Sequence, residues 1–104
     1  MAVAITLGTK ENVPVDIEDV TGIITTLVGS NPKFDVLDDA DVLLINQQAA
    51  TVSGTMRLLC LCDFSNEVTF PTAHYRLFVE FTFGSEQIRL GPFDLQIIDE
   101  NILL

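Results

Sequence analysis

Basic residues are scarce in this chain. Lys and Arg number 5 against 15 Asp and Glu, which gives a formal net charge of -10 over 104 residues. Nucleic-acid binding needs clustered Lys and Arg to neutralise phosphate, so a nucleic-acid partner is disfavoured, and an anionic membrane surface is disfavoured for the same reason. The acidic residues are spread along the chain, a pattern typical of a solvated, self-repelling surface.

Long apolar runs are also absent. No segment approaches the ~18 apolar residues that a membrane span needs. The opening MAVAITLGTKEN has no basic residue before its short apolar stretch, so a secretory signal is not expected. The chain shows no internal repeat, low-complexity tract or linker. Its length and its 48% hydrophobic content predict one folded domain over residues 1–104.

Cysteine occurs only twice, as Cys60 and Cys62 in the tripeptide CLC. On a strand, side chains two residues apart point to the same face, and two cysteines held in this way do not easily reach disulfide geometry. We therefore predict buried, reduced thiols. A zinc site that joined them to His74 would lack a fourth ligand and the usual spacing.

Histidine occurs once, tyrosine once and tryptophan not at all. His74 follows Pro71 near the expected start of a strand, without a nucleophile motif, and is predicted to be a surface or strand-end residue. Sugar-binding surfaces usually rely on exposed Trp and Tyr rings, so a carbohydrate module is disfavoured. Carboxylate pairs for glycoside hydrolysis have no fixed spacing, and with 15 acids chance pairs are expected. We predict no enzyme activity and no cofactor.

One acidic cluster resembles calcium-loop chemistry, since hard cations prefer several oxygen ligands. It comprises Asp35, Asp38, Asp39 and Asp41. The glycine and the distal glutamate of an EF-hand loop are not in place, so a solvated turn is the favoured interpretation.

The chain does contain turn-forming Gly, Pro, Asn and Asp residues at regular intervals of ~8–12 residues. This spacing predicts an all-β sandwich or barrel. The clearest element is the ribbon HYRLFVEFTFGSEQIRLGPFDLQI, residues 74–97. A two-residue turn at Gly84 and Ser85 predicts its register, because apolar residues then pair on one face and the charged pair has opposite signs. The predicted pairs are Phe83 with Glu86, Phe81 with Ile88, Glu80 with Arg89, and Val79 with Leu90.

The alternation of this ribbon changes phase at Gly91 and Pro92. Ile88 and Leu90 share one face, but the next inward residue follows Leu90 by an odd number of positions. A bulge, a bend or a change of sheet is required there. Proline cannot donate to a ladder, so this position is expected at a sheet edge or at a break in pairing.

Four further segments are candidate elements. Residues 2–7 and 22–28 are expected to be strands, and residues 56–64, apolar on both faces, a central strand. Residues 41–46 fit either a strand or a helix capped near Asp39. Residues 16–28 also carry a partial helical spacing, so a fold with one helix on a sheet remains an alternative.

The order of these features resembles the N-terminal immunoglobulin-like module of phage baseplate upper proteins and related small virion modules. A leading strand is followed by a Pro-Val-Asp-Ile step, and a tyrosine opens the penultimate strand. Ala73 stands where that family has a glycine before the tyrosine. The resemblance covers most of the chain and implies an immunoglobulin-like antiparallel β-sandwich. The matching residues are Pro14, Val15, Asp16, Ile17, Thr21, Gly22, Tyr75 and Phe93.

The resemblance implies a non-enzymatic structural protein of a phage virion, made in the host cytoplasm. It would be a capsid decoration or cement protein, or a tail or baseplate component, that assembles with other virion proteins and as a homo-oligomer. The apolar terminal residues Ile102, Leu103 and Leu104 are the predicted partner-binding residues, with folding back onto the chain's own core as the alternative. A carbohydrate- or calcium-binding sandwich is the alternative function.

Overall fold

The computed structural model describes residues 3–6, 9–65 and 73–98, and within these ranges the chain is built from β-strands. No helix in these ranges is long and apolar enough to cross a membrane. The helical alternatives for residues 16–28 and 41–46 are wrong, because both segments are non-helical. The strands are β1 (Val3–Thr6), β2 (Lys10–Asp16), β3 (Lys33–Leu37), β4 (Leu43–Ala49), β5 (Thr51–Ser53), β6 (Arg57–Asp63), β7 (Ala73–Phe83) and β8 (Glu86–Ile98).

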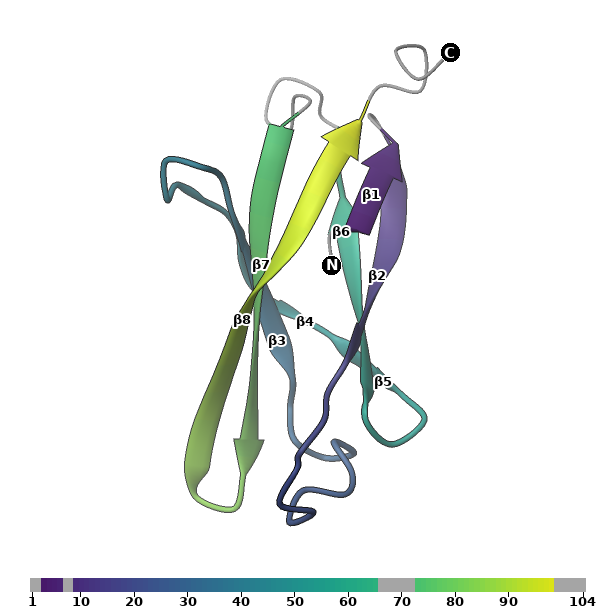
Figure 1. Cartoon of the computed structure of the whole chain (residues 1–104), viewed down its shortest axis with the longest axis vertical. Helices are drawn as coiled ribbons and strands as arrows, with labels where there is room; N and C mark the ends of the chain where they lie inside the picture. Colours follow the sequence, from purple (N-terminus) through teal and green to yellow (C-terminus); the bar gives the residue numbers. More distant parts are fainter. Residues whose placement is uncertain (1–2, 7–8, 66–72, 99–104) are drawn as a thin grey trace.

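Two sheets pack face to face, so the predicted β-sandwich is confirmed (Figure 1). One sheet has the strand order β1-β8-β7-β3-β4 and the other has the order β2-β6-β5. This division of strands is the immunoglobulin-like arrangement. The sheets are antiparallel with one exception, because β1 pairs with β8 in parallel, from Val3 opposite Leu95 to Thr6 opposite Ile98.

The β7–β8 ribbon has the predicted register, including Phe81 opposite Ile88 and Glu80 opposite Arg89. The predicted irregularity is also present. Leu77 lies opposite Phe93 and Val79 opposite Leu90, so β8 carries one extra residue there, at the cis Gly91–Pro92 peptide. Gly91 has φ +140°, and a Cβ atom at this position would lie 2.9 Å from the Leu77 carbonyl oxygen. Glycine is therefore needed at the break.

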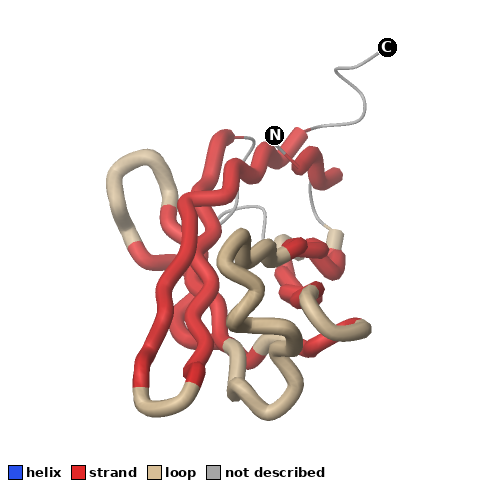
Figure 2. Tube along the Cα trace, turned by 60° about the horizontal axis from the view of Figure 1, so that its bottom comes forward, coloured by secondary structure: helices blue, strands red, loops and turns tan. Residues whose placement is uncertain are grey.

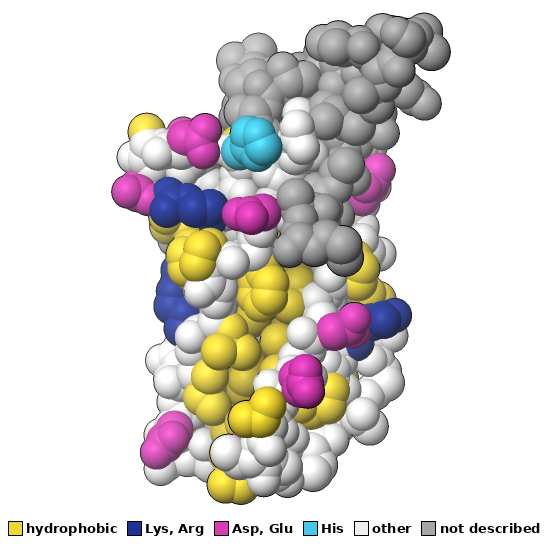
Figure 3. All heavy atoms as spheres, viewed as in Figure 1, with side chains coloured by type: hydrophobic (Ala, Val, Ile, Leu, Met, Phe, Trp, Pro, Cys, Tyr) yellow, Lys and Arg dark blue, Asp and Glu magenta, His cyan; other side chains and the backbone are white. Residues whose placement is uncertain are grey.

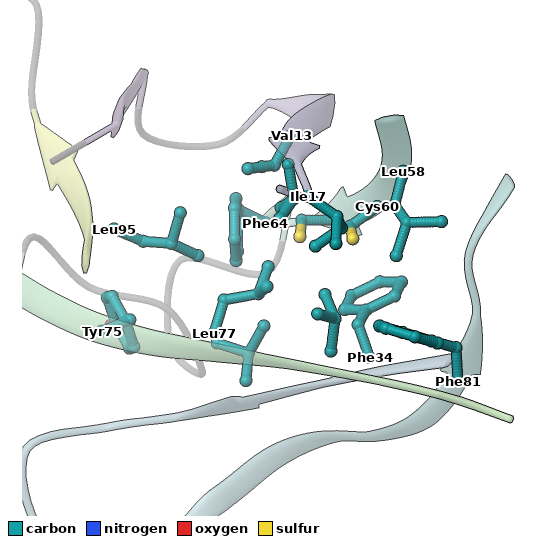
Figure 4. Close-up of a cluster of buried hydrophobic side chains, with 14 of the residues drawn as sticks. Val13, Ile17, Phe34, Leu58, Cys60, Phe64, Tyr75, Leu77, Phe81 and Leu95 are labelled. Atoms are coloured by element: carbon teal, nitrogen blue, oxygen red, sulfur yellow. The ribbon is translucent and has the colours of Figure 1, made fainter. Parts of the chain in front are cut away.

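The core lies between the sheets and is filled mainly by inward residues of β2, β3, β6, β7 and β8 (Figure 4). In β6, Leu58, Cys60 and Cys62 point inward and are fully buried, which confirms the prediction of buried thiols. β6 is the central strand of its sheet, but the outer face of that sheet is open to solvent. The outward residue Leu61 is therefore partly exposed. The Phe64 and Tyr75 rings stack across the core with centroids 6.5 Å apart.

The strand predicted over residues 22–28 is wrong. Residues 17–32 connect β2 to β3 as an irregular loop (Figure 2). Asp19 organises it locally: its carboxylate accepts hydrogen bonds from the backbone N–H and hydroxyl of Thr21 and from the backbone N–H of Ile24. These bonds satisfy backbone groups that a strand would pair with a neighbour.

Candidate binding surface

The predicted partner-binding residues Ile102, Leu103 and Leu104 lie outside the described residues. Their role stays a prediction. The largely exposed apolar side chains that the structure describes belong to other parts of the chain.

The acidic cluster is divided by the fold. Asp38 and Asp41 belong to the β3–β4 turn, where an Asp38 carboxylate oxygen accepts hydrogen bonds from the backbone N–H groups of Ala40 and Val42, and Asp41 pairs with Arg76. Asp35 instead lies within β3 and is buried. Among the residues that the structure describes, no three His, Cys, Asp or Glu side chains are grouped to hold a metal ion.

His74 and the two cysteines lie in different environments. His74 is exposed on β7, opposite Gln96 of β8, as expected of a strand-end residue. Burial raises the pKa of the Cys60 and Cys62 thiols to about 12. At neutral pH both thiols are therefore protonated and poor nucleophiles.

An ionic network covers the outward face of the five-stranded sheet. Arg89 Nη1 donates to Asp35 Oδ2 at 2.7 Å and to Glu80 Oε1 at 2.5 Å, and the guanidinium lies 4.5 Å from the centre of the Phe78 ring. The backbone N–H of Gln47 donates to the other Asp35 oxygen at 2.6 Å. The hydrogen bonds to Asp35 and Glu80 raise the pKa of Arg89.

The Glu80–Arg89 pair of this network follows from the hairpin register, but the part played by Asp35 could not be found from the sequence. Asp35 sits between two fully buried neighbours, Phe34 and Val36, and points to the opposite face. The alternation of apolar and polar residues over 34–36 was the one available signal. To infer the contact with Arg89 from this signal, one would need to know that β3 pairs with β7, and that pairing is a long-range contact.

Exposed apolar side chains gather at the end of the sandwich formed by the 17–32 loop and the β7–β8 turn. Val20, Ile23 and Val28 of the loop are 90%, 68% and 67% exposed. A hollow of about 250 Å³ separates the loop from the end of β7 and is lined in part by Ile24, Val28 and Phe83. Figure 3 shows apolar side chains at the surface in the lower half of one face of the molecule.

Partly exposed apolar side chains also occur on the first half of β8. Ile88 and Leu90 face the core side of the sheet, opposite the buried residues Phe81 and Val79, yet both remain partly exposed. We call the partly or largely exposed apolar side chains of the loop and of this half-strand the open apolar surface. It consists of Val20, Ile23, Ile24, Val28, Phe83, Ile88 and Leu90.

No protein-family model matches this chain, and no curated protein matches it. Among solved structures, the chain is similar to an endo-β-1,4-mannanase from Thermotoga petrophila, with 14% sequence identity and a TM-score of 0.49. The match covers 91% of this chain and 17% of the mannanase chain, so this chain spans less than a fifth of that protein's length.

Proposed function

We propose that this chain is a non-enzymatic structural protein of a phage virion that acts by protein–protein assembly. The observation that carries the proposal is the open apolar surface, whose three most prominent side chains, Val20, Ile23 and Val28, are more than half exposed. Several largely exposed apolar side chains at one end of a domain are typical of protein–protein contact sites, since leaving them in water costs free energy that a partner recovers.

The resemblance to phage immunoglobulin-like modules supports the choice of a virion. Val15 and Ile17 of the Pro-Val-Asp-Ile step and Tyr75 at the start of β7 are buried, as framework residues of such a module would be. The proposed partners are other virion structural proteins, with further copies of the chain in the assembled particle. The proposed positions are a capsid decoration, a tail or a baseplate.

Charge sets a condition on this assembly. A chain with a net charge of -10 repels its own copies over a Debye length of about 10 Å at 0.1 M salt. Apolar contact, or a basic surface on the partner, must overcome that repulsion. The open apolar surface and the predicted contact of Ile102 to Leu104 supply the apolar component of this proposal.

The proposal is tested by quantitative mass spectrometry of phage particles purified from lysates of the host cells that produce them. We expect the chain to copurify with the major capsid or tail protein in a fixed ratio. Val20→Asp should lower its incorporation, whereas the matched control Thr25→Asp, on an exposed polar residue of the same loop, should not. Absence of the chain from purified particles would contradict the proposal. A melting temperature raised by calcium or a soluble glycan would favour the ligand-binding alternative.

A further inference from the structure

We propose that the free edge of β8 over Glu86–Leu90 binds an extended strand of a different protein, in which apolar residues alternate with Lys or Arg. This inference rests on the proposed function, because it specifies how a chain that acts by assembly contacts its partner. It concerns the mode of contact, strand addition, and the chemistry of the partner segment.

The backbone of β8 has two different halves. β7 pairs with one edge of β8 along almost its whole length, from Glu86 to Ile97. On the other edge β1 pairs only with Leu95–Ile98. In the part of the chain that the structure describes, no strand pairs with that edge over Glu86–Leu90. An unpaired edge presents a row of N–H and C=O groups that an extended segment can join by main-chain hydrogen bonds.

The side chains of β8 differ in the same way as its backbone. Leu95 and Ile97, in the half that β1 flanks, are 0% and 1% exposed. Ile88 and Leu90, which face the core from the unflanked half, stay partly exposed, although their partners across the ribbon are buried. The inward side chains of β8 are thus completely buried in the half that pairs with β1 and only partly buried in the other half. A strand placed alongside Glu86–Leu90 would therefore cover Ile88 and Leu90, and its own inward side chains would be apolar.

Charge selects the partner. Four of the five basic residues already form ion pairs with carboxylates of the same chain: Lys10, Arg57, Arg76 and Arg89. The outward charged residue of the free edge, Arg89, is already paired with two carboxylates, Asp35 and Glu80, and Figure 3 shows acidic side chains beside the exposed apolar ones. A strand from a second copy would bring a net charge of -10 to this surface and be repelled. A segment of another protein whose outward residues are Lys or Arg is complementary.

A fused segment tests this inference on the full chain. Val3 lies opposite Leu95, and β1 runs parallel to β8. A segment attached before Met1 through a flexible Gly-Ser linker can therefore reach the Leu90 end of the free edge. The test segment would be Lys-Val-Lys-Val-Thr-Val, about the length of an average strand. The matched control carries proline in place of both lysines and the threonine, which removes their N–H donors and preserves the valines.

The readout is the exchange of the Glu86–Leu90 backbone amides with solvent deuterium, followed by NMR. A short flexible linker gives an effective concentration of about 1 mM, so a segment whose dissociation constant is about ten times lower slows exchange about tenfold. We expect this slowing for amides on the free edge with the valine–lysine fusion and not with the proline fusion. Equal exchange in both fusions would overturn the inference.

Two substitutions separate strand addition from non-specific adhesion. Ile88→Lys places a charge on the inward face of the free edge and should abolish the slowing. Gln87→Thr changes the outward face of the same strand without adding a charge that would repel the lysines of the segment, and it should preserve the slowing. Slowing that survives Ile88→Lys would count against the proposed site. If Ile88→Lys does not fold, Leu90→Thr, a milder change on the same face, is used in its place and should weaken the slowing.

This test is independent of the virion experiment. Detection of the chain in purified particles, together with unchanged amide exchange, would remove the strand-addition site and leave the proposed function. Slowed exchange in a chain that is absent from particles would leave the strand-binding edge and remove the virion role.

Discussion

The Arg89 network provides a quantitative test of how this fold is held together. In Arg89→Ala, Asp35 and Glu80 both lose the cation that lies 2.7 Å and 2.5 Å from their carboxylate oxygens. The Asp35 side chain is only 6% exposed and depends on donors of the protein such as Arg89, whereas the Arg89 side chain is 41% exposed and part of its own interaction is screened.

The expected loss in the free energy of unfolding lies between the loss for a surface ion pair and the loss for a buried ion pair. A hydrogen bond to a charged group contributes about 1.5–3 kcal/mol, and the loss of one partner of a fully buried pair costs about 3–5 kcal/mol. Solvent screening of Arg89 reduces these values, and the contact with the Phe78 ring adds about 0.5–1 kcal/mol. We expect Arg89→Ala to lower the free energy of unfolding by about 2–3 kcal/mol, which a domain with a stability of about 5–15 kcal/mol can tolerate.

Urea unfolding followed by circular dichroism measures this change. Arg57→Ala is the matched control, because its pair with Asp16 has a similar N–O distance of 2.7 Å but lies between exposed side chains, and it should change the midpoint far less. Asp35→Asn added to Arg89→Ala should recover part of the loss, since it removes the uncompensated charge. Equal effects of Arg89→Ala and Arg57→Ala would refute the reasoning.

Three further predictions concern the thiols, the break in β8 and the C-terminal residues. Because burial raises the pKa of Cys60 and Cys62 from 9.0 to about 12, the unfolded chain loses these protons first, so stability should fall as pH rises from 9 towards 12. Urea midpoints across this range should fall less in a Cys60→Ala, Cys62→Ala variant, and an equal fall in both proteins would contradict this. Gly91→Ala should lower the melting temperature more than Gly54→Ala, because both glycines have positive φ but only at Gly91 would the new Cβ meet other atoms, and equal shifts would contradict the steric explanation. Deletion of residues 101–104 should leave the domain folded but weaken incorporation into particles, with partial recovery at higher salt. Incorporation as tight as that of the full chain would place the contact elsewhere.

The elements that could be predicted from the sequence are those whose information is local. The β7–β8 ribbon carries its turn residues, its alternation and its charged pair within 24 residues, so one register satisfies all three at once. The burial of Cys60 and Cys62 follows from the apolar run around them. In both cases the partner strand is either adjacent in sequence or unnecessary for the inference.

The errors arise where a local side chain competes for backbone groups or where long-range pairing decides the structure. Residues 22–28 have strand-like composition, but Asp19 binds their neighbouring backbone groups and leaves the segment as a loop. β2 was not predicted, because Lys10–Asp16 alternates without a large apolar residue and becomes a strand by pairing with β6, more than 40 residues away. β3 and β5 are short and were likewise not predicted. Asp35 belongs to the same class, since its role depends on the pairing of β3 with β7 and β4.

The phase change at Gly91 and Pro92 connects the sequence pattern to the candidate surface. It shows that β8 consists of two half-strands, and proline at the junction indicates that the strand has an edge there. Only the structure identifies which half is covered, because β1 comes from the other end of the chain and reaches no further than Leu95. The residues that precede the break, Ile88 and Leu90, have the apolar character of a core strand but only one neighbouring strand. This mismatch between composition and burial places the proposed binding edge on Glu86–Leu90 rather than elsewhere along the ribbon.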